Sequence, residues 1–331
     1  MIEKCLRDWA IDKVFTITVD NASSNDVATQ YLKRKLNNVS GTLLEGKYIH
    51  MRCVAHIINL VVTDGLKEVN ESITRVRSSV KYVRQSPARL HRFKECIDLE
   101  KIQSKSLLSM DCSTRWNSTY LMLDAAQKFE RAFERFEEID HNYKHELVLN
   151  GGTPKEEDWG NVRKVSKFLQ RFYEFTLKVS GTTYVTSNVY FPEICELYCT
   201  LCDWIKSDDE QFSAMAKRMK EKFEKYWGNV ERMNMILYVA TVLDPRRKYV
   251  FADFCFKRMY SPDQASVLSS NLRDATSKLF VEYHGLLKVS QGEGSNFTQP
   301  TSATNADGSN SDSPLNIVTD FEKYLVEIGL G

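Results

Sequence analysis

The first strong pattern in the chain is an apolar run at residues 14–19, which is rich in β-branched and aromatic side chains and ends at Asp20. Such a run is typical of a short buried strand. Helical spacing follows at 26–36, and a second strand and helix are expected at 46–53 and 54–67. Strands that alternate with helices over short connections indicate a parallel sheet with helices packed on it.

Most of the remaining pattern is helical. The apolar stripe from Met122 to Phe136 predicts a long helix after Trp116. Thr153 is expected to open another helix through a capping box, with Pro154 in its first position. Further helices are expected at 209–227, 233–242 and 262–288. The predicted fold class is therefore α/β, but mostly helical.

Both ends of the chain indicate parts of a larger domain. The first nine residues keep helical spacing before any strand, and a single following strand is too little sheet to bury such a helix. Residues 290–314 are mostly Gly, Ser, Asn, Thr and Gln, which is typical of a linker. We therefore expect the sequence to begin and end inside a longer protein.

Composition changes this picture only in part. The 331 residues are 42% hydrophobic and 27% charged, which is ordinary for a soluble globular protein. A formal net charge of +1 gives no global argument for nucleic acid, so local clustering must supply one. Eight Cys without a secretory signal indicate reduced intracellular thiols. No apolar run is long enough to span a membrane, so no membrane association is expected.

Asp20 is the first candidate for chemistry, because it stands at the carboxyl end of the first predicted strand. The ends of strands in open α/β sheets hold side chains rigidly while leaving them accessible. A second interpretation is that Asp20 and Asn21 cap the following helix through their side-chain oxygens. The two roles are compatible.

Cys53 and His56 form a C-x-x-H pair between the second predicted strand and helix. Structural zinc normally takes four ligands, and no matching second pair stands nearby, so a packed Cys beside a hydrogen-bonded His is the favoured interpretation. Three further thiols share one predicted helix face, where a helical core is favoured over a metal site. These thiols are Cys195, Cys199 and Cys202.

Two later segments carry a possible nucleic-acid signal. Residues 75–94 hold seven Lys or Arg and no acidic residue, and Arg77, Lys81 and Arg84 fall on one helix face. Such a face can follow a phosphate backbone, although most are simply solvated. Arg115-Trp116 precedes the apolar stripe, and an indole can stack on an exposed base while a guanidinium holds phosphate. Burial in the core is the alternative for the indole.

Three stretches together, at residues 16–25, 52–60 and 114–120, resemble the hAT superfamily of DNA transposases. The closest likeness is to plant domesticated members of the RICESLEEPER and DAYSLEEPER type, which carry a zinc finger BED domain. Residues 172–191 and 243–249 also resemble the plant hAT region that follows the Arg-Trp motif.

The resemblance implies a ribonuclease H-like core interrupted by a large all-α insertion. It also implies an Asp-Asp-Glu set that binds two divalent ions, Mg²⁺ or Mn²⁺, in the intact family core. Asp20 matches the second Asp of that set. Cys53 and His56 match the family's C-x-x-H motif, and Arg115 and Trp116 match its Arg-Trp motif, both placed close to the DNA end and its flipped base.

The chain departs from the family pattern at both ends. The family's first Asp lies upstream of the opening helix and its Glu lies after the insertion, so we expect an incomplete core with Asp20 as a vestigial metal ligand. No required cofactor and no BED finger are expected in this chain. The expected domains are a partial core at 1–125, the helical insertion at 126–289, a linker at 290–315 and the start of a further core segment at 316–331.

The leading functional hypothesis is a nuclear, transposase-derived DNA-binding protein that lacks autonomous transposition and associates with related full-length transposase-like proteins. One alternative is a metal-dependent nuclease or transposition subunit completed by a partner chain. Another is a helical protein-interaction scaffold that uses the face of Phe129, Phe133 and Phe136.

Overall fold

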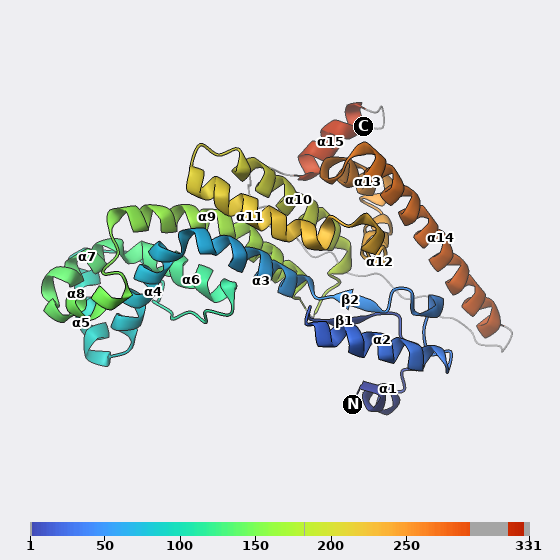
Figure 1. The fold of residues 1–331 in the computed structure, drawn as a ribbon, viewed down its shortest axis with the longest axis horizontal. Coiled ribbons are helices and arrows are strands. Elements are labelled where there is room, and N and C mark those ends of the chain that lie inside the picture. Colours follow the sequence, from blue (N-terminus) through green and yellow to red (C-terminus); the bar gives the residue numbers. More distant parts are fainter. Residues whose placement is uncertain (1, 182, 292–316, 328–331) are drawn as a thin grey trace. The chain divides into compact units, whose positions relative to one another are not determined.

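The computed structural model of the protein describes residues 2–181, 183–291 and 317–327 (Figure 1). These residues form α-helices, short 3₁₀ turns and one two-stranded sheet. They divide into two compact units. The first unit takes residues from 1–54, 182–200 and 229–331, and the second takes residues 55–181 and 201–228. Within the described ranges, no helix is both long and apolar enough to cross a membrane.

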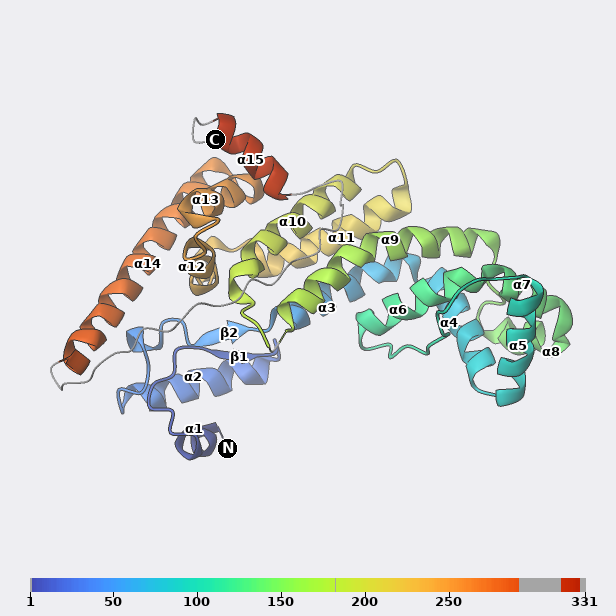
Figure 2. The ribbon, with the colours of Figure 1, turned by 180° about the vertical axis from the view of Figure 1, so that it is seen from behind.

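The sheet of the first unit consists of β1 (Ile17–Val19) and β2 (His50–Arg52), which run parallel. α2 (Ser23–Asn37) connects them and lies alongside in both views (Figures 1 and 2). Ile17 is paired with His50 and Val19 with Arg52. Both strands are shorter than predicted, and the Asn234 side chain donates to the carbonyls of Tyr48 (3.3 Å) and His50 (3.1 Å) at the start of β2.

Helices make up the rest of the first unit. α12 and α14 both pack on α13, and an aromatic cluster joins this group to α10, with the Phe191 ring centroid 4.6 Å from Tyr238 and 4.8 Å from Phe256. The helices are α1 (Ile2–Asp8), α10 (Ser187–Ile205, to Thr200 in this unit), α12 (Ile236–Val242), α13 (Lys248–Met259), α14 (Pro262–Gln291) and α15 (Ile317–Glu327).

The described part of the second unit consists of helices and the loops that connect them. α4 and α6 pack on α9, and α5 packs on α7. Its helices are α3 (Val54–Gly65), α4 (Asn70–Arg84), α5 (Pro87–Leu99), α6 (Trp116–Ala126), α7 (Glu130–Ile139), α8 (His141–Leu147), α9 (Glu156–Val179) and α11 (Glu210–Trp227). α3 and α11 approach closely at Gly65, where a Cβ atom would lie 2.3 Å from Met219 Cγ.

Two helix predictions were wrong. The long helix after Trp116 is two helices, because Phe129 leaves the helical conformation and packs instead against Phe93, with ring centroids 6.3 Å apart. α9 begins at Glu156 rather than near Thr153, since Asp158 accepts a hydrogen bond from the Lys155 N–H (2.8 Å) and closes the helix start there.

The helices at 209–227 and 262–288 are confirmed as α11 and α14, and α12 begins later than predicted, at Ile236. From residue 292 onward the expected linker lies outside the described residues. The face predicted for protein interaction is core, because Phe129, Phe133 and Phe136 are each 2% exposed or less.

Candidate functional site

Asp20 follows β1 directly and is exposed at the end of the strand, as predicted. Its Oδ1 accepts hydrogen bonds from the Ala22 N–H (2.9 Å) and from Asn25 Nδ2 (2.6 Å). The carboxylate therefore bonds to Ala22, the residue directly before α2, and to the side chain of Asn25 in its first turn, which fixes the turn that leads into the helix.

Cys53 leaves β2 at the same edge of the sheet. Its backbone N–H donates to the carbonyl of Val19 (2.8 Å), and Val19 is the last residue of β1. The parallel register thus places Asp20 and Cys53 beside each other in the first unit. His56 is half-buried in the first turn of α3 and belongs to the second unit.

The side chains around Asp20 do not fit a two-metal centre. A pair of divalent ions needs several carboxylate or imidazole ligands that converge on one place. In the part of the chain that the structure describes, no three His, Cys, Asp or Glu side chains do so. The nearby Asp26 faces His50 instead, with 3.7 Å between Oδ1 and Nδ1. No chemical step through a metal follows from this donor set.

Arginines of the basic segment at 75–94 pair with carboxylates from later parts of the chain, most of which are nearly buried. Arg77 binds Asp111 with two nitrogens, Nε at 2.9–3.0 Å from both oxygens and Nη2 at 2.9 Å from Oδ2. Asp111 is 5% exposed at its side chain, so this pair is partly desolvated. Three further arginines of the segment are paired through one nitrogen each: Arg75 with Asp158, Arg92 with Asp140 and Arg89 with the exposed Glu146.

The three cations predicted to share one face of α4 therefore differ in whether they are already paired. Arg77 is committed to Asp111, whereas Lys81 and Arg84 are exposed and make no ion pair with any described residue. An unpaired, hydrated cation is free to exchange its counterion for a phosphate. Lys81 and Arg84 keep the geometry that the sequence predicted.

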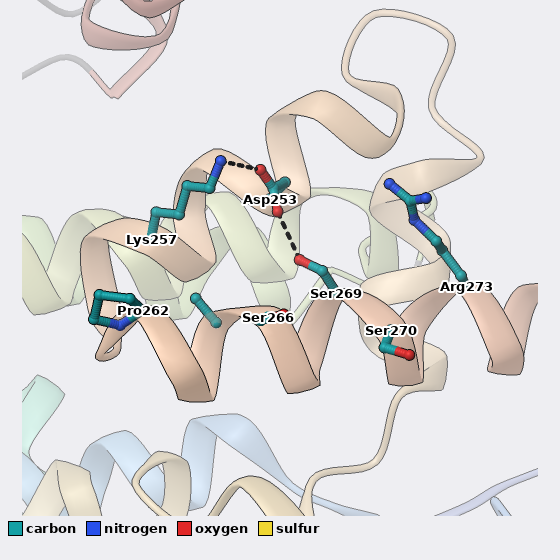
Figure 3. Close-up of a pocket in the computed structure, with 8 residues that line it drawn as sticks. Asp253, Lys257, Pro262, Ser266, Ser269, Ser270 and Arg273 are labelled. Carbon is teal, nitrogen blue, oxygen red and sulfur yellow. Dashed lines mark hydrogen bonds and ion pairs between the residues drawn. The ribbon is translucent and has the colours of Figure 1, made fainter.

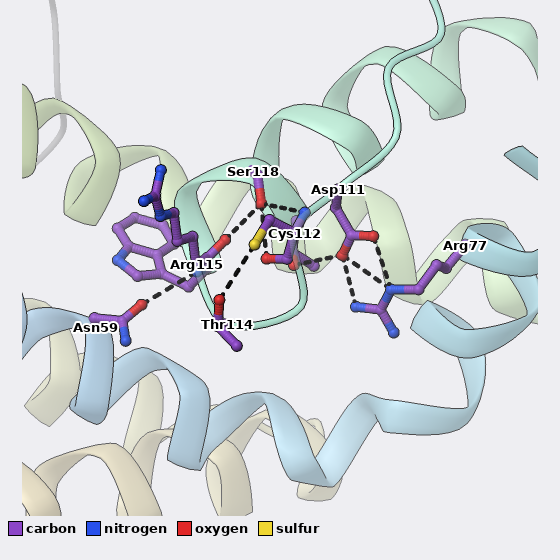
Figure 4. A network of polar contacts seen from close by, with 9 residues as sticks. Asn59, Arg77, Asp111, Cys112, Thr114, Arg115 and Ser118 are labelled. Carbon is purple, nitrogen blue, oxygen red and sulfur yellow. Dashed lines mark hydrogen bonds and ion pairs between the residues drawn. The ribbon is translucent and has the colours of Figure 1, made fainter. Parts of the chain in front are cut away.

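Arg115 and Trp116 stand at the start of α6 with opposite exposures. Arg115 is exposed at the N-cap position, and Figure 4 shows its guanidinium pointing away from Asp111 and Cys112. Trp116 is only 2% exposed, its backbone N–H donates to Asn59 Oδ1 (3.2 Å), and its ring centroid lies 6.4 Å from that of Tyr120. The buried indole presents no open face to a base in this conformation.

A closed network of hydrogen bonds holds the loop before Arg115 (Figure 4). Ser118 Oγ accepts from the Cys112 N–H (2.8 Å) and lies 2.7 Å from the Arg115 carbonyl. Asp111 also accepts from Thr119 Oγ1 (2.8 Å). Hydrogen bonding with Thr114 lowers the pKa of the exposed Cys112 thiol. Arg115 is thus presented from a loop with fixed ends.

Sequence reasoning missed the residues that fix this loop. Asn59 and Asp111 were not singled out, although both lie in or next to the stretches that carried the family resemblance. Asn59 comes one helical turn after His56, and Asp111 comes just before Cys112. A polar residue on the inner face of an apolar helix was the available signal for Asn59, since such a group needs a partner when buried.

Three protein-family models match the chain. The ZBED1 RNase-like domain matches residues 1–48, the ZBED1 RNase-like helical domain matches 51–168, and the hAT-like transposase with RNase-H fold matches 188–283. The chain belongs to the hAT-like transposase family. The predicted hAT resemblance and the mostly helical fold with a ribonuclease H relationship are confirmed.

Curated hAT relatives include plant proteins of the type that the sequence resembled. The zinc finger BED domain-containing protein RICESLEEPER 2 of Oryza sativa subsp. japonica is 33% identical over 99% of this chain and 44% of its own length. RICESLEEPER 4 of the same species is 32% identical over 85% of the chain and 40% of its length. DAYSLEEPER of Arabidopsis thaliana is 27% identical over 98% and 43%. The chain spans less than half the length of these relatives. No solved structure matches it.

Proposed function

We propose that this chain is a DNA-binding protein of hAT transposase origin, with Arg115 as its central contact to the DNA backbone. The observation that carries the proposal is the exposed Arg115 guanidinium, held at the start of α6 by the loop from Asp111 to Ser118. A guanidinium matches a phosphate with two parallel N–H donors. Phosphate contacts of this kind position a protein on DNA without reading its sequence.

The other predicted contacts take two kinds of role. Lys81 and Arg84 are exposed and add backbone contacts. Cys53 and His56 flank the start of α3 and are half-buried, so they contribute at most short-range contacts at that helix start. Arg77 and Trp116 support the site structurally and do not contact the DNA. Arg77 pairs with Asp111, and the buried Trp116 anchors α6.

Catalysis is not part of the proposal for this chain by itself. Asp20 supplies one carboxylate, and the donor set of the described residues does not form the two-metal centre of the family. If a longer protein or a partner chain adds carboxylates, Asp20 becomes the ligand of Mg²⁺ or Mn²⁺ that the hAT resemblance implies. The site of action that follows from DNA binding is the nucleus, and related transposase-like proteins are the expected associates.

A gel-shift series across salt concentrations tests the proposal. Labelled duplex and hairpin DNA are titrated with the full chain at rising salt. We expect binding whose affinity falls linearly on a log–log plot, with a slope of about −0.9 for each phosphate contacted. A chain that shows no salt-sensitive binding to either DNA would rule the function out.

A further inference from the structure

A groove of about 600 Å³ lies between α13 and α14 in the first unit. Its volume is in the range of small-molecule sites. The α14 side of the groove is one polar helix face, because its members recur at helical spacing from residue 266 to 273. The lining residues are Asp253, Lys257, Pro262, Ala265, Ser266, Ser269, Ser270 and Arg273 (Figure 3).

The one carboxylate that lines the groove, that of Asp253, is already paired with other side chains of the protein. Asp253 accepts from Lys257 Nζ (2.7 Å) on one oxygen and from Ser269 Oγ (2.7 Å) on the other. Burial raises the pKa of Asp253, but these hydrogen bonds outweigh it, so the pKa lies below its ordinary value. Lys257 also donates to the Tyr324 hydroxyl of α15 (3.3 Å), which occupies another of its three N–H groups.

Arg273 is the second cation of the groove, and no described acidic side chain pairs with it. Its guanidinium carbon lies 5.2 Å from the centre of the Tyr249 ring. Stacking on a ring uses the face of the guanidinium and leaves the N–H groups at its edge available. In Figure 3 the side chain reaches from α14 toward α13.

The groove therefore holds one carboxylate against two cations, and the exposed hydroxyls of Ser266 and Ser270 add donors beside Arg273. An anion with several acceptor oxygens satisfies such a set better than a single carboxylate does, because each oxygen can take a separate donor. We propose that the α13–α14 groove binds a phosphate group, supplied by the backbone of the bound DNA strand. The choice of DNA as its source rests on the proposed function.

Inorganic phosphate tests the groove without DNA. The melting temperature of the full chain is followed as phosphate is added, with acetate at equal ionic strength as the reference, since a ligand that binds the folded state raises it. We expect a saturable rise with phosphate alone, its loss in Arg273→Ala, its partial return in Arg273→Lys, and no change in Lys278→Ala. Lys278 is an exposed cation on the same helix that does not line the groove.

The absence of a rise in the wild type would overturn the inference, as would an equal rise with acetate or in Arg273→Ala. Circular dichroism of each variant confirms that it is folded.

The DNA titration decides the source of the phosphate. Arg273→Ala should lower the slope of log affinity against log salt by about 1, as expected for one lost phosphate contact. An unchanged slope in a variant that has lost phosphate binding would overturn DNA as the source. If the wild type binds no DNA at all, the proposed function fails, and the phosphate titration alone then decides whether the groove is an anion site.

Discussion

At the scale of single residues, Arg115 and Trp116 show what sequence can and cannot predict about this site. The motif indicated both as DNA contacts, and the structure exposes Arg115 while burying the indole of Trp116 beside Tyr120. Likewise, the cationic face on α4 was predicted, but the pairing of Arg77 with Asp111 was not. Contacts between distant segments depend on how helices pack, and the spacing of residues within one segment does not predict that packing.

Asn59 should matter for DNA binding although it carries no charge. Asn59→Ala removes the acceptor of the Trp116 backbone N–H, so we expect a loss of about 1–2 kcal/mol in the free energy of unfolding, since Trp116 is 2% exposed. We also expect weaker DNA binding with an unchanged salt slope. Urea denaturation and gel shifts measure the two effects. Gln103→Ala, at an exposed position of the same unit, serves as the control. Full DNA affinity in Asn59→Ala would show that Arg115 needs no such support.

The Arg77–Asp111 pair should behave as a structural bridge. Arg77→Ala leaves a nearly buried carboxylate without its partner, and because Arg77 itself is 30% exposed we expect a loss of about 2–3 kcal/mol. Arg77→Ala with Asp111→Ala should cost less than the sum of the single changes. A double-mutant cycle in urea measures this coupling. Additive losses would mean that the bridge does not hold the loop.

At the scale of elements, the long amphipathic helices were predicted well, and the ends and breaks were not. α11 and α14 follow their apolar spacing, which is a local property. The start of α9 depends instead on Asp158, which also binds Arg75 on α4 (2.9 Å). The His50 carbonyl of β2 likewise accepts from Asn234, which lies 184 positions away. Neither partner is visible in a local pattern.

The crossing of α3 and α11 should tolerate no side chain at residue 65. A Cβ there would stand 2.3 Å from Met219 Cγ and 2.7 Å from its Sδ. We expect Gly65→Ala to cost about 1–3 kcal/mol, the usual cost of overpacking a core. Thermal unfolding measures the loss. Combined with Met219→Ala, which removes a buried side chain, the total loss should be smaller than the sum of the two single losses. Strictly additive losses would contradict the close approach.

The turn between α12 and α13 should depend on pH through Asp244. Hydrogen bonds from Arg246 above all, and from Asn188, hold the pKa of this carboxyl well below its ordinary value despite burial. Because the pKa of Asp244 is lower in the folded state than in the unfolded state, its carboxylate stabilises the fold at any pH above the unfolded-state pKa. This stabilisation is lost as the pH falls through the folded-state pKa. We expect Asp244→Asn to lose about 1–3 kcal/mol at neutral pH.

Urea denaturation across pH measures this effect. The difference between wild type and Asp244→Asn should stay constant down to about pH 4 and shrink below it. The exposed Asp98 gives a control in Asp98→Asn, for which no such difference is expected. A difference that stays constant into strong acid would contradict the assigned role of Asp244.

At the scale of the whole molecule, the fold class and the family followed from short motifs, and the interleaving of the two units did not. The chain passes between the units after residues 54, 181, 200 and 228. Apolar stripes predict that a helix is buried, but they do not say against which neighbours. The acid-free segment at 75–94 illustrates the point, since four of its seven cations are matched by acids from 111 to 158.

The whole-molecule claim is that this hAT-family chain binds DNA through an exposed Arg115 on a rigid loop. Salt-dependent DNA titration of Arg115→Ala beside Arg115→Lys and Lys167→Ala tests it most directly. Lys167 serves as the control, because it is an exposed cation of the same unit that makes no ion pair with any described residue. We predict about tenfold weaker binding and a salt slope reduced by about 1 in Arg115→Ala. Arg115→Lys should keep the slope, and Lys167→Ala should match the wild type. Equal affinities and slopes in Arg115→Ala and the wild type would contradict the account.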